Sequence, residues 1–200
     1  MQSLLSLRNS FSKLLFLVFV VNILFFLLLL FINQESYTVT AFQNLFLAGN
    51  SDLFIKKPLT FFTWFWLHTS VFHLVGNLVV LYFFGNQLSP LIGTKKIISL
   101  FLLANFISGC IYVIVACFFP TTALLSGLSS SVFAIAFLAI TIQKNKQTTS
   151  FIFVAIYLIL FAFSISAKNW GGTIAHFSGV LVGLAYLLFI EKKSKKTIKF

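Results

Sequence analysis

Long apolar runs alternate with short polar connections along most of this chain. A helix that crosses a bilayer needs roughly 20 mostly apolar residues, and six segments approach that length. They are Leu14–Ile32, Leu67–Phe84, Ile97–Phe119, Leu125–Ile142, Phe151–Ser166 and Ile174–Ile190. Six such spans and their connections use nearly all of the 200 residues. The pattern predicts an all-α membrane protein in which residues 1–200 form a single transmembrane domain, a six-transmembrane-helix bundle.

The composition and the longest connection agree with a membrane protein. Of all residues, 60% are hydrophobic and 28 are phenylalanine, a bias far outside that of soluble domains. The connection 33–67 ends in the aromatic-rich stretch Phe61–Trp66, and aromatic side chains favour the interface between membrane and water. We therefore expect 33–67 to be an external loop that is partly embedded in the membrane.

Positive charge is distributed unevenly over the predicted connections. The formal net charge is +11, and the three acidic residues all lie outside the apolar runs. With the N-terminus inside, eleven basic residues fall on inner segments and only Lys56, Lys57 and Lys168 on outer ones. Cytoplasmic loops carry such an excess of Lys and Arg, so we expect a plasma (inner) membrane protein with both termini cytoplasmic. The basic cytoplasmic tail 191–200 then faces anionic lipid, and no nucleic acid partner is implied.

Polar side chains inside the apolar runs are predicted to lie at a similar depth. His68, His73 and Asn77 fall in the outer half of the second span. Ser129 lies about one turn below the outer surface in the fourth span, and His176 is at a matching level in the sixth. A polar side chain in hydrocarbon is costly unless a partner or a function retains it. An interhelical hydrogen bond, typically about 0.6–2 kcal/mol, explains Asn77 alone, whereas the whole set favours a functional site.

Small residues in the fourth and sixth spans predict close helix packing. Residues 126–134 read Ser-Gly-Leu-Ser-Ser-Ser-Val-Phe-Ala, and Gly179 and Gly183 share a helix face with His176. Faces of small residues let helices pack tightly in lipid. Packing explains the two glycines, but it does not explain His176, because tight packing does not require a titratable base.

Ser129 and His176 together indicate nucleophilic chemistry. A serine hydroxyl becomes an effective nucleophile when a neighbouring base accepts its proton, and His176 is the best-placed base. No acidic residue lies in any span, so we expect a Ser–His dyad. His73 and Asn77 share a helix face and, with the Ser129 backbone N–H, provide donors for an oxyanion hole. A metal site is less favoured, because His68 and His73, five residues apart, do not share a helix face and no carboxylate completes the ligand set.

The same residues resemble the motifs of the rhomboid family of intramembrane serine proteases. The resemblance covers about residues 60–190 in the family's order and includes the helix exit Tyr82–Gly85. Its three patterns are His68-x4-His73-x3-Asn77, Gly127-x-Ser129 and Ala175-His176-x2-Gly179-x3-Gly183. It implies a six-helix core with Ser129 as the nucleophile and His176 as the general base. It also implies an oxyanion hole formed by His73, Asn77 and the Ser129 backbone.

The resemblance implies supporting roles as well. His68 is expected to support the site through hydrogen bonds, and Phe133, four residues after the nucleophile, to pack on the His176 ring. Many family members have glycine directly after the nucleophile, whereas this chain has Ser130 followed by Ser131.

The predicted function is intramembrane proteolysis, in which the chain cleaves transmembrane segments of other membrane proteins near the outer membrane face. Such a substrate must unwind locally, because a helix's own hydrogen bonds cover its backbone. The loop 167–172 and the fifth span are expected to cap the site and to form its lateral gate. The partners implied are transmembrane protein substrates and the lipid bilayer, with no metal and no cofactor.

Two other functions remain open at this point. The first is a catalytically silent rhomboid-like protein that binds membrane clients. Loss of Ser129 or His176 would mark such a protein, and both residues are present. The second is a small transporter that uses the polar pocket for a substrate or a proton. Transporters usually show broken helices and inverted repeats, and the sequence shows neither.

Overall fold

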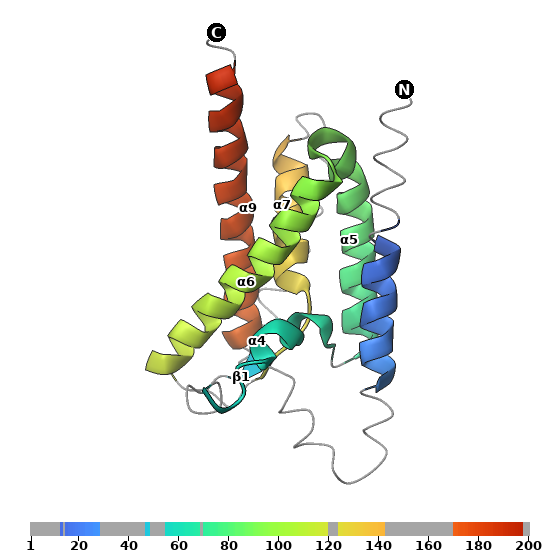
Figure 1. Cartoon of the computed structure of the whole chain (residues 1–200), viewed down its shortest axis with the longest axis vertical. Helices are drawn as coiled ribbons and strands as arrows, with labels where there is room; N and C mark the ends of the chain where they lie inside the picture. The colour runs from blue at the N-terminus through green and yellow to red at the C-terminus, as the bar shows by residue number, and fades with distance from the viewer. Residues whose placement is uncertain are drawn as a thin grey trace.

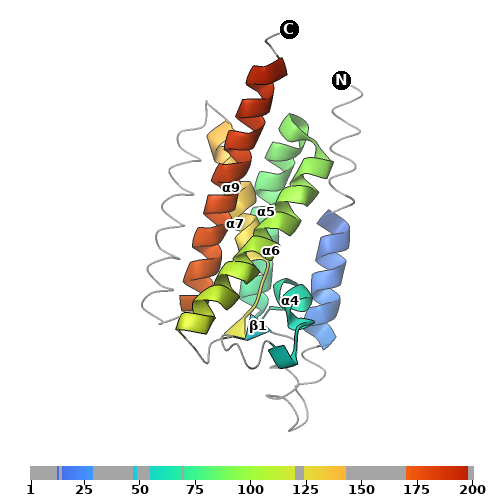
Figure 2. The same ribbon diagram turned by 60° about the vertical axis from the view of Figure 1, so that its left-hand side comes forward.

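Helices formed by the apolar runs dominate the computed structural model, which describes residues 13, 15–28, 47–48, 55–68, 70–119, 124–142 and 170–197. The first described helix is Leu15–Leu28. It is followed by β1 (Leu47–Ala48), α4 (Thr60–Thr63), the 3-10 helix η1 (Trp64–Trp66), α5 (Val71–Ile92), α6 (Thr94–Phe118), β2 (Leu124–Leu125), α7 (Ser129–Ile142) and α9 (Trp170–Thr197). The views in Figures 1 and 2 show these helices side by side in one bundle.

Helix α7 lies at the centre of this bundle, in contact with α5, α6 and α9 (Figure 2). Residues 129–136 are all buried, although the helix has only 14 residues. At 1.5 Å per residue it is about 21 Å long, shorter than the roughly 30 Å hydrocarbon core of a bilayer. The longer helices therefore surround a short helix whose first eight residues are all buried.

Three of the described helices are long and apolar enough to cross a membrane, namely α5, α6 and the part of α9 up to Ile190. Helix Leu15–Leu28 and α7 are apolar but shorter. The predicted span Phe151–Ser166 lies outside the described residues. The structure is thus that of a multi-pass helical membrane protein, and the count of six crossings stays a prediction.

Helix α5 differs from the predicted second span at both ends. It begins at Val71 rather than Leu67, because the Ser70 side chain caps it by accepting a hydrogen bond from the His73 backbone N–H at 3.2 Å. The predicted helix exit at Gly85 is wrong, since the helix continues to Ile92. Leu88 and Ser89 in the added turns are buried, so packing continues where the apolar run stops. The expected connection Gly85–Lys96 is reduced to Gly93, whose φ is 84°.

The fourth and sixth spans also have different bounds from those predicted. Helix α7 begins at Ser129 rather than Leu125, because Leu124 and Leu125 pair with Ala48 and Leu47 as a short antiparallel ladder. This pair is the one departure from an all-helical fold in the described residues. Helix α9 starts before the predicted span Ile174–Ile190 and continues to Thr197, so it takes in much of the basic tail.

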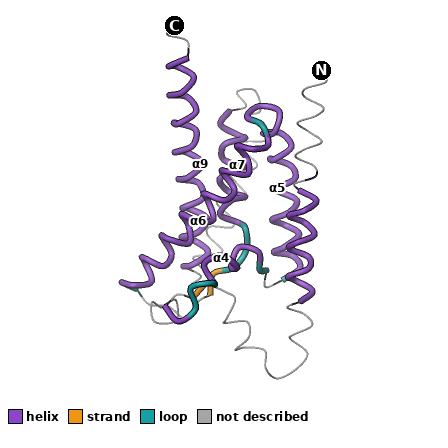
Figure 3. Tube along the Cα trace, viewed as in Figure 1, coloured by secondary structure: helices purple, strands orange, loops and turns teal. Residues whose placement is uncertain are grey.

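The two ends of the bundle differ in structure and in charge. Helix α5 gives way to α6 and α9 ends at the same end of the bundle, whereas helix Leu15–Leu28 begins nearer its middle (Figure 1). Exposed lysines lie next to or within these helix ends: Lys13, Lys95, Lys96 and Lys192. Loop and strand segments gather at the opposite end (Figure 3), where α4 follows Lys56 and Lys57.

Close contact between α7 and α9 confirms the packing role predicted for two glycines. A Cβ atom on Gly179 would overlap the backbone carbonyl of Ser130. On Gly183 it would lie 2.8 Å from the carbonyl oxygen of Ala134, and real Cβ contacts this short are essentially never seen. Because backbone atoms on α7 cannot move aside as a side chain can, neither position admits a larger residue without separating the helices.

We predict that Gly179→Ala lowers the free energy of unfolding by about 1–3 kcal/mol, the usual cost of overpacking a tight interface. Gly76→Ala is the matched control, because Gly76 lies on α5 with no atom within 4 Å of the added Cβ. Alanine there should be neutral or stabilising by up to ~1 kcal/mol. Thermal unfolding of both variants in detergent measures the difference. Equal stabilities would show that α7 and α9 are not in close contact at Gly179.

Candidate active site

Ser129 and His176 meet between α7 and α9. The His176 Nε2 atom lies 3.0 Å from the Ser129 Oγ atom, within hydrogen-bond distance. Ser129 is the first residue of α7 and is 6% exposed, whereas His176 lies in the second turn of α9. These two residues were expected to meet, and the structure brings them together.

The ring of Phe133 lies against the His176 ring, as the resemblance implied. Their centroids are 4.4 Å apart and the ring planes are inclined by 44°. Phe133 is four residues after Ser129, so both side chains project from the same face of α7. The helix that carries the hydroxyl therefore also restricts the orientation of the imidazole.

No carboxylate among the described residues contacts the other nitrogen of this imidazole. The Nδ1 atom of His176 is buried without a hydrogen-bond partner in the described part of the chain. Glu191 is on the same helix but 15 residues further along, about 22 Å away at 1.5 Å per residue. Within the described part of the chain the pair therefore has the arrangement of a dyad, without the third group of a Ser–His–Asp triad.

A second polar pair lies on and just before α5. The Asn77 Nδ2 atom is 3.0 Å from the His68 Nε2 atom, and His68 lies in the loop before the helix rather than within a span. Burial, with a smaller effect from nearby His73, lowers the pKa of His68 to about 3. The ring is therefore neutral at neutral pH, and its Nε2 accepts an N–H from the amide. The second N–H of this amide remains for another acceptor.

Gly127 brings α5 close to the start of α7. A Cβ atom on Gly127 would lie 2.6 Å from Cε1 and 2.8 Å from Nε2 of His73, and 3.5 Å from Nδ2 of Asn77. Both side chains thus lie against the backbone two residues before Ser129. The His73 ring also contacts the His68 ring, with centroids 4.9 Å apart. The expected oxyanion donors therefore lie beside Gly127, two residues before the serine.

The three consecutive serines have different surroundings. The Ser131 hydroxyl donates to the Leu128 carbonyl at 2.7 Å. The Ser130 hydroxyl is buried without a hydrogen-bond partner in the described residues, and the Ser130 backbone faces Gly179. Ser129 is the serine whose hydroxyl lies at His176.

Two backbone links at the start of α7 were not predicted from the sequence. The Gly127 N–H donates to the Trp64 carbonyl at 3.1 Å, and β1 pairs with β2 just before it. Both attach the predicted external loop to the turn that precedes Ser129. The only signal in the sequence was the aromatic stretch around the fully buried Trp64.

In the predicted cap, residues 170–172 form the first turn of α9, and 167–169 lie outside the described residues.

The fold and the site define a helical membrane protein in which a buried serine contacts a partly buried histidine. The chain belongs to the rhomboid family, because residues 56–193, more than half of its length, match the Rhomboid domain. This match confirms the resemblance drawn from the motifs and contains every candidate site residue. No match was found among curated proteins.

We predict that Gly127→Ala destabilises the protein more than Gly93→Ala does. Both glycines have positive φ, +93° and +84°, and residues held in such conformations cost about 1–3 kcal/mol. Gly93 has no atom within 4 Å of an added Cβ, whereas Gly127 has the His73 ring. Thermal unfolding of the two variants separates backbone strain from the clash. Equal destabilisation would mean that His73 does not lie against Gly127.

Proposed function

We propose that this protein is an intramembrane serine endopeptidase that cleaves transmembrane segments of other membrane proteins near the outer membrane face. The observation that carries the proposal is the 3.0 Å contact between Ser129 Oγ and His176 Nε2 in a rhomboid domain. The family includes serine proteases and inactive members. What favours catalysis in this chain is the presence of both residues, in contact.

In the proposed mechanism, Ser129 attacks the scissile carbonyl while His176 accepts its proton. The histidine then donates that proton to the leaving amine, and an acyl-enzyme forms on the serine. Water enters, gives a proton to His176 and hydrolyses the ester, which restores the dyad. Because no carboxylate contacts His176 among the described residues, orientation of its ring depends on Phe133 and on the packing of α9.

The negative charge of the tetrahedral intermediate falls beside donors that are neutral. Asn77 keeps one amide N–H after donating the other to His68, and His73 lies next to it. Since α7 begins at Ser129, the backbone N–H of this residue has no partner within the helix. The positive end of the helix dipole also favours an anion at this point. Donors fixed in this way stabilise the transition state without reorganising.

The substrate class follows from where the dyad lies. The apolar exterior of the bundle, which includes Phe72, Val75 and Val79 on α5, suits a partner that is itself embedded in lipid. Its scissile bond must leave the helical state, because intrahelical hydrogen bonds cover the backbone. We infer that segments which unwind easily near the outer face are the preferred substrates.

Catalytic variants distinguish this function from that of a silent client-binding protein. We predict that Ser129→Ala abolishes cleavage of a transmembrane substrate in proteoliposomes, because loss of a catalytic nucleophile costs 10⁴-fold or more. Ser130→Ala, which removes a buried hydroxyl without a described partner, should retain activity. Adding His176→Ala to Ser129→Ala should cause no further loss, since the two act as a unit. Cleavage by the Ser129→Ala variant, or its loss in Ser130→Ala, would contradict the assignment.

The oxyanion role of Asn77 has its own test. We predict that Asn77→Ala lowers kcat by about 10²–10³, the cost of removing one such donor, with little change in KM. Asn105→Ala is the matched control, because Asn105 is also a buried asparagine and its side chain makes no hydrogen bond in the described residues. Its turnover should stay within a few-fold of wild type. A wild-type kcat in folded Asn77→Ala protein would limit this residue to packing.

A further inference from the structure

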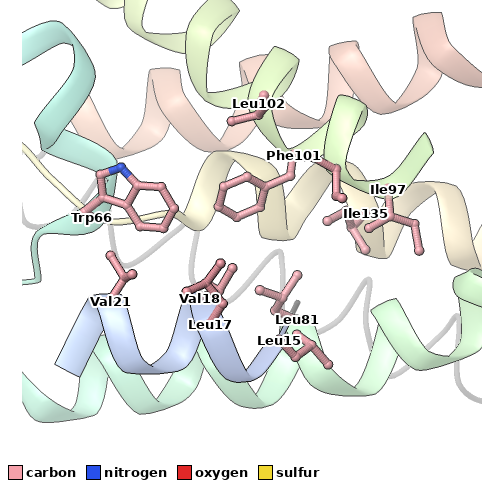
Figure 4. Close-up of a pocket in the computed structure, with 11 residues that line it drawn as sticks. Leu15, Leu17, Val18, Val21, Trp66, Leu81, Ile97, Phe101, Leu102 and Ile135 are labelled. Carbon is pink, nitrogen blue, oxygen red and sulfur yellow. The ribbon is translucent and has the colours of Figure 1, made fainter. Parts of the chain in front are cut away.

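A cavity lies between helix Leu15–Leu28 and the remainder of the bundle (Figure 4). Its volume is about 270 Å³, and all of its lining side chains are hydrophobic. They come from the first helix, from η1, and from α5, α6 and α7. Neither Ser129 nor His176 lines it, so this cavity is separate from the dyad.

The cavity is elongated along the first helix. Figure 4 shows Ile97 and Ile135 at one end, Val21 and Trp66 at the other, and Leu15 between them. Six residues separate Leu15 from Val21, which corresponds to about 9 Å of helix. A narrow apolar space of this length suits a section of a hydrocarbon chain better than a compact molecule.

The cavity opens sideways to the exterior of the bundle. Two of its lining residues, Leu17 and Leu102, are 59% and 50% exposed. In a membrane protein this exterior faces lipid, and an apolar space has no polar groups with which to retain water. The molecules at the opening are therefore acyl chains.

Positive charge lies at one end of the same cavity. Lys95 and Lys96 directly precede Ile97, and Lys13 is two residues before Leu15. All three lysines are exposed. The first turn of α6 contains no acidic residue, and two cations there oppose the positive end of the helix dipole. An anion beside this turn would relieve the repulsion.

We propose that this cavity binds an anionic phospholipid, with one acyl chain between the first helix and α6 and the phosphate at Lys13, Lys95 and Lys96. The apolar walls select the hydrocarbon chain, and the lysines select the charge of the headgroup. Basic sites between membrane helices bind acidic headgroups in this way. The lipid fills the space between the first helix, which lies outside the matched residues 56–193, and the rhomboid domain. The proposal does not depend on catalysis.

Native mass spectrometry of the delipidated full-length protein tests the proposal. Phosphatidylglycerol and phosphatidylcholine with identical chains are titrated, and we expect the anionic lipid to bind at 1:1 stoichiometry about tenfold more tightly. The double variant Lys95→Gln/Lys96→Gln should lose about tenfold or more in affinity for phosphatidylglycerol. The control Lys56→Gln/Lys57→Gln, at the other end of the bundle, should bind as wild type does.

A second variant tests whether an acyl chain occupies the cavity. Val18→Phe places a ring in the cavity and should weaken both lipids, whereas Val79→Phe, on the exposed face of α5, should weaken neither. Millimolar inorganic phosphate should not displace the lipid, and displacement would assign the site to free phosphate. Equal binding of the two lipids, or unchanged binding in Val18→Phe, would overturn the proposal.

Photo-crosslinking of the wild type covers the case in which a variant does not fold. Phosphatidylglycerol with a diazirine in its acyl chain should label peptides that contain residues 15–21 and 97–102. Labelling confined to other helices would contradict the proposed site.

Discussion

The contact between two backbones, those of α7 and α9, determines the geometry of the site. Gly179 lies against Ser130 and Gly183 against Ala134, and both helices run in the same direction (Figure 1). This register places His176, one turn before Gly179, beside Ser129, the residue before Ser130. In lipid, helix association depends on such close packing rather than on the hydrophobic effect. A larger side chain at either glycine would therefore change the distance between hydroxyl and imidazole.

The start of α7 is a second constraint, which positions the expected oxyanion donors rather than the Ser–His dyad. The positive φ of Gly127 ends the extended segment after β2, and the hydrogen bond from Gly127 N–H to the Trp64 carbonyl attaches it to η1. Because this backbone lacks a Cβ, His73 and Asn77 can lie against it. The helix then begins inside the bundle, with its first N–H groups and its dipole directed at the site. The segment that precedes α5 thus helps to position the site.

The sequence predicted what depends on hydrophobicity and on residue type. Apolar runs located the long helices of the described residues, and the spacing of Gly179 and Gly183 from His176 predicted the interface that forms. It did not predict the start of α5 at Val71 or that of α7 at Ser129, because a Ser70 cap and a strand pair override a continuous apolar run. The sequence also predicted, wrongly, that α5 ends at Gly85, because hydropathy falls there. The helix continues because tertiary packing buries Leu88 and Ser89. The link from Trp64 to Gly127 joins distant segments through backbone atoms and leaves no pattern in the side chains.

Reaction with a fluorophosphonate, followed by peptide mapping of the adduct, tests most directly the claim that Ser129 is a nucleophile activated by His176. We expect one covalent adduct on Ser129 in the folded wild type, lost in His176→Ala although the hydroxyl remains. Because such probes require an activated serine, structural proximity alone does not produce this result. An adduct on Ser130 or Ser131, or equal labelling of wild type and His176→Ala, would contradict it.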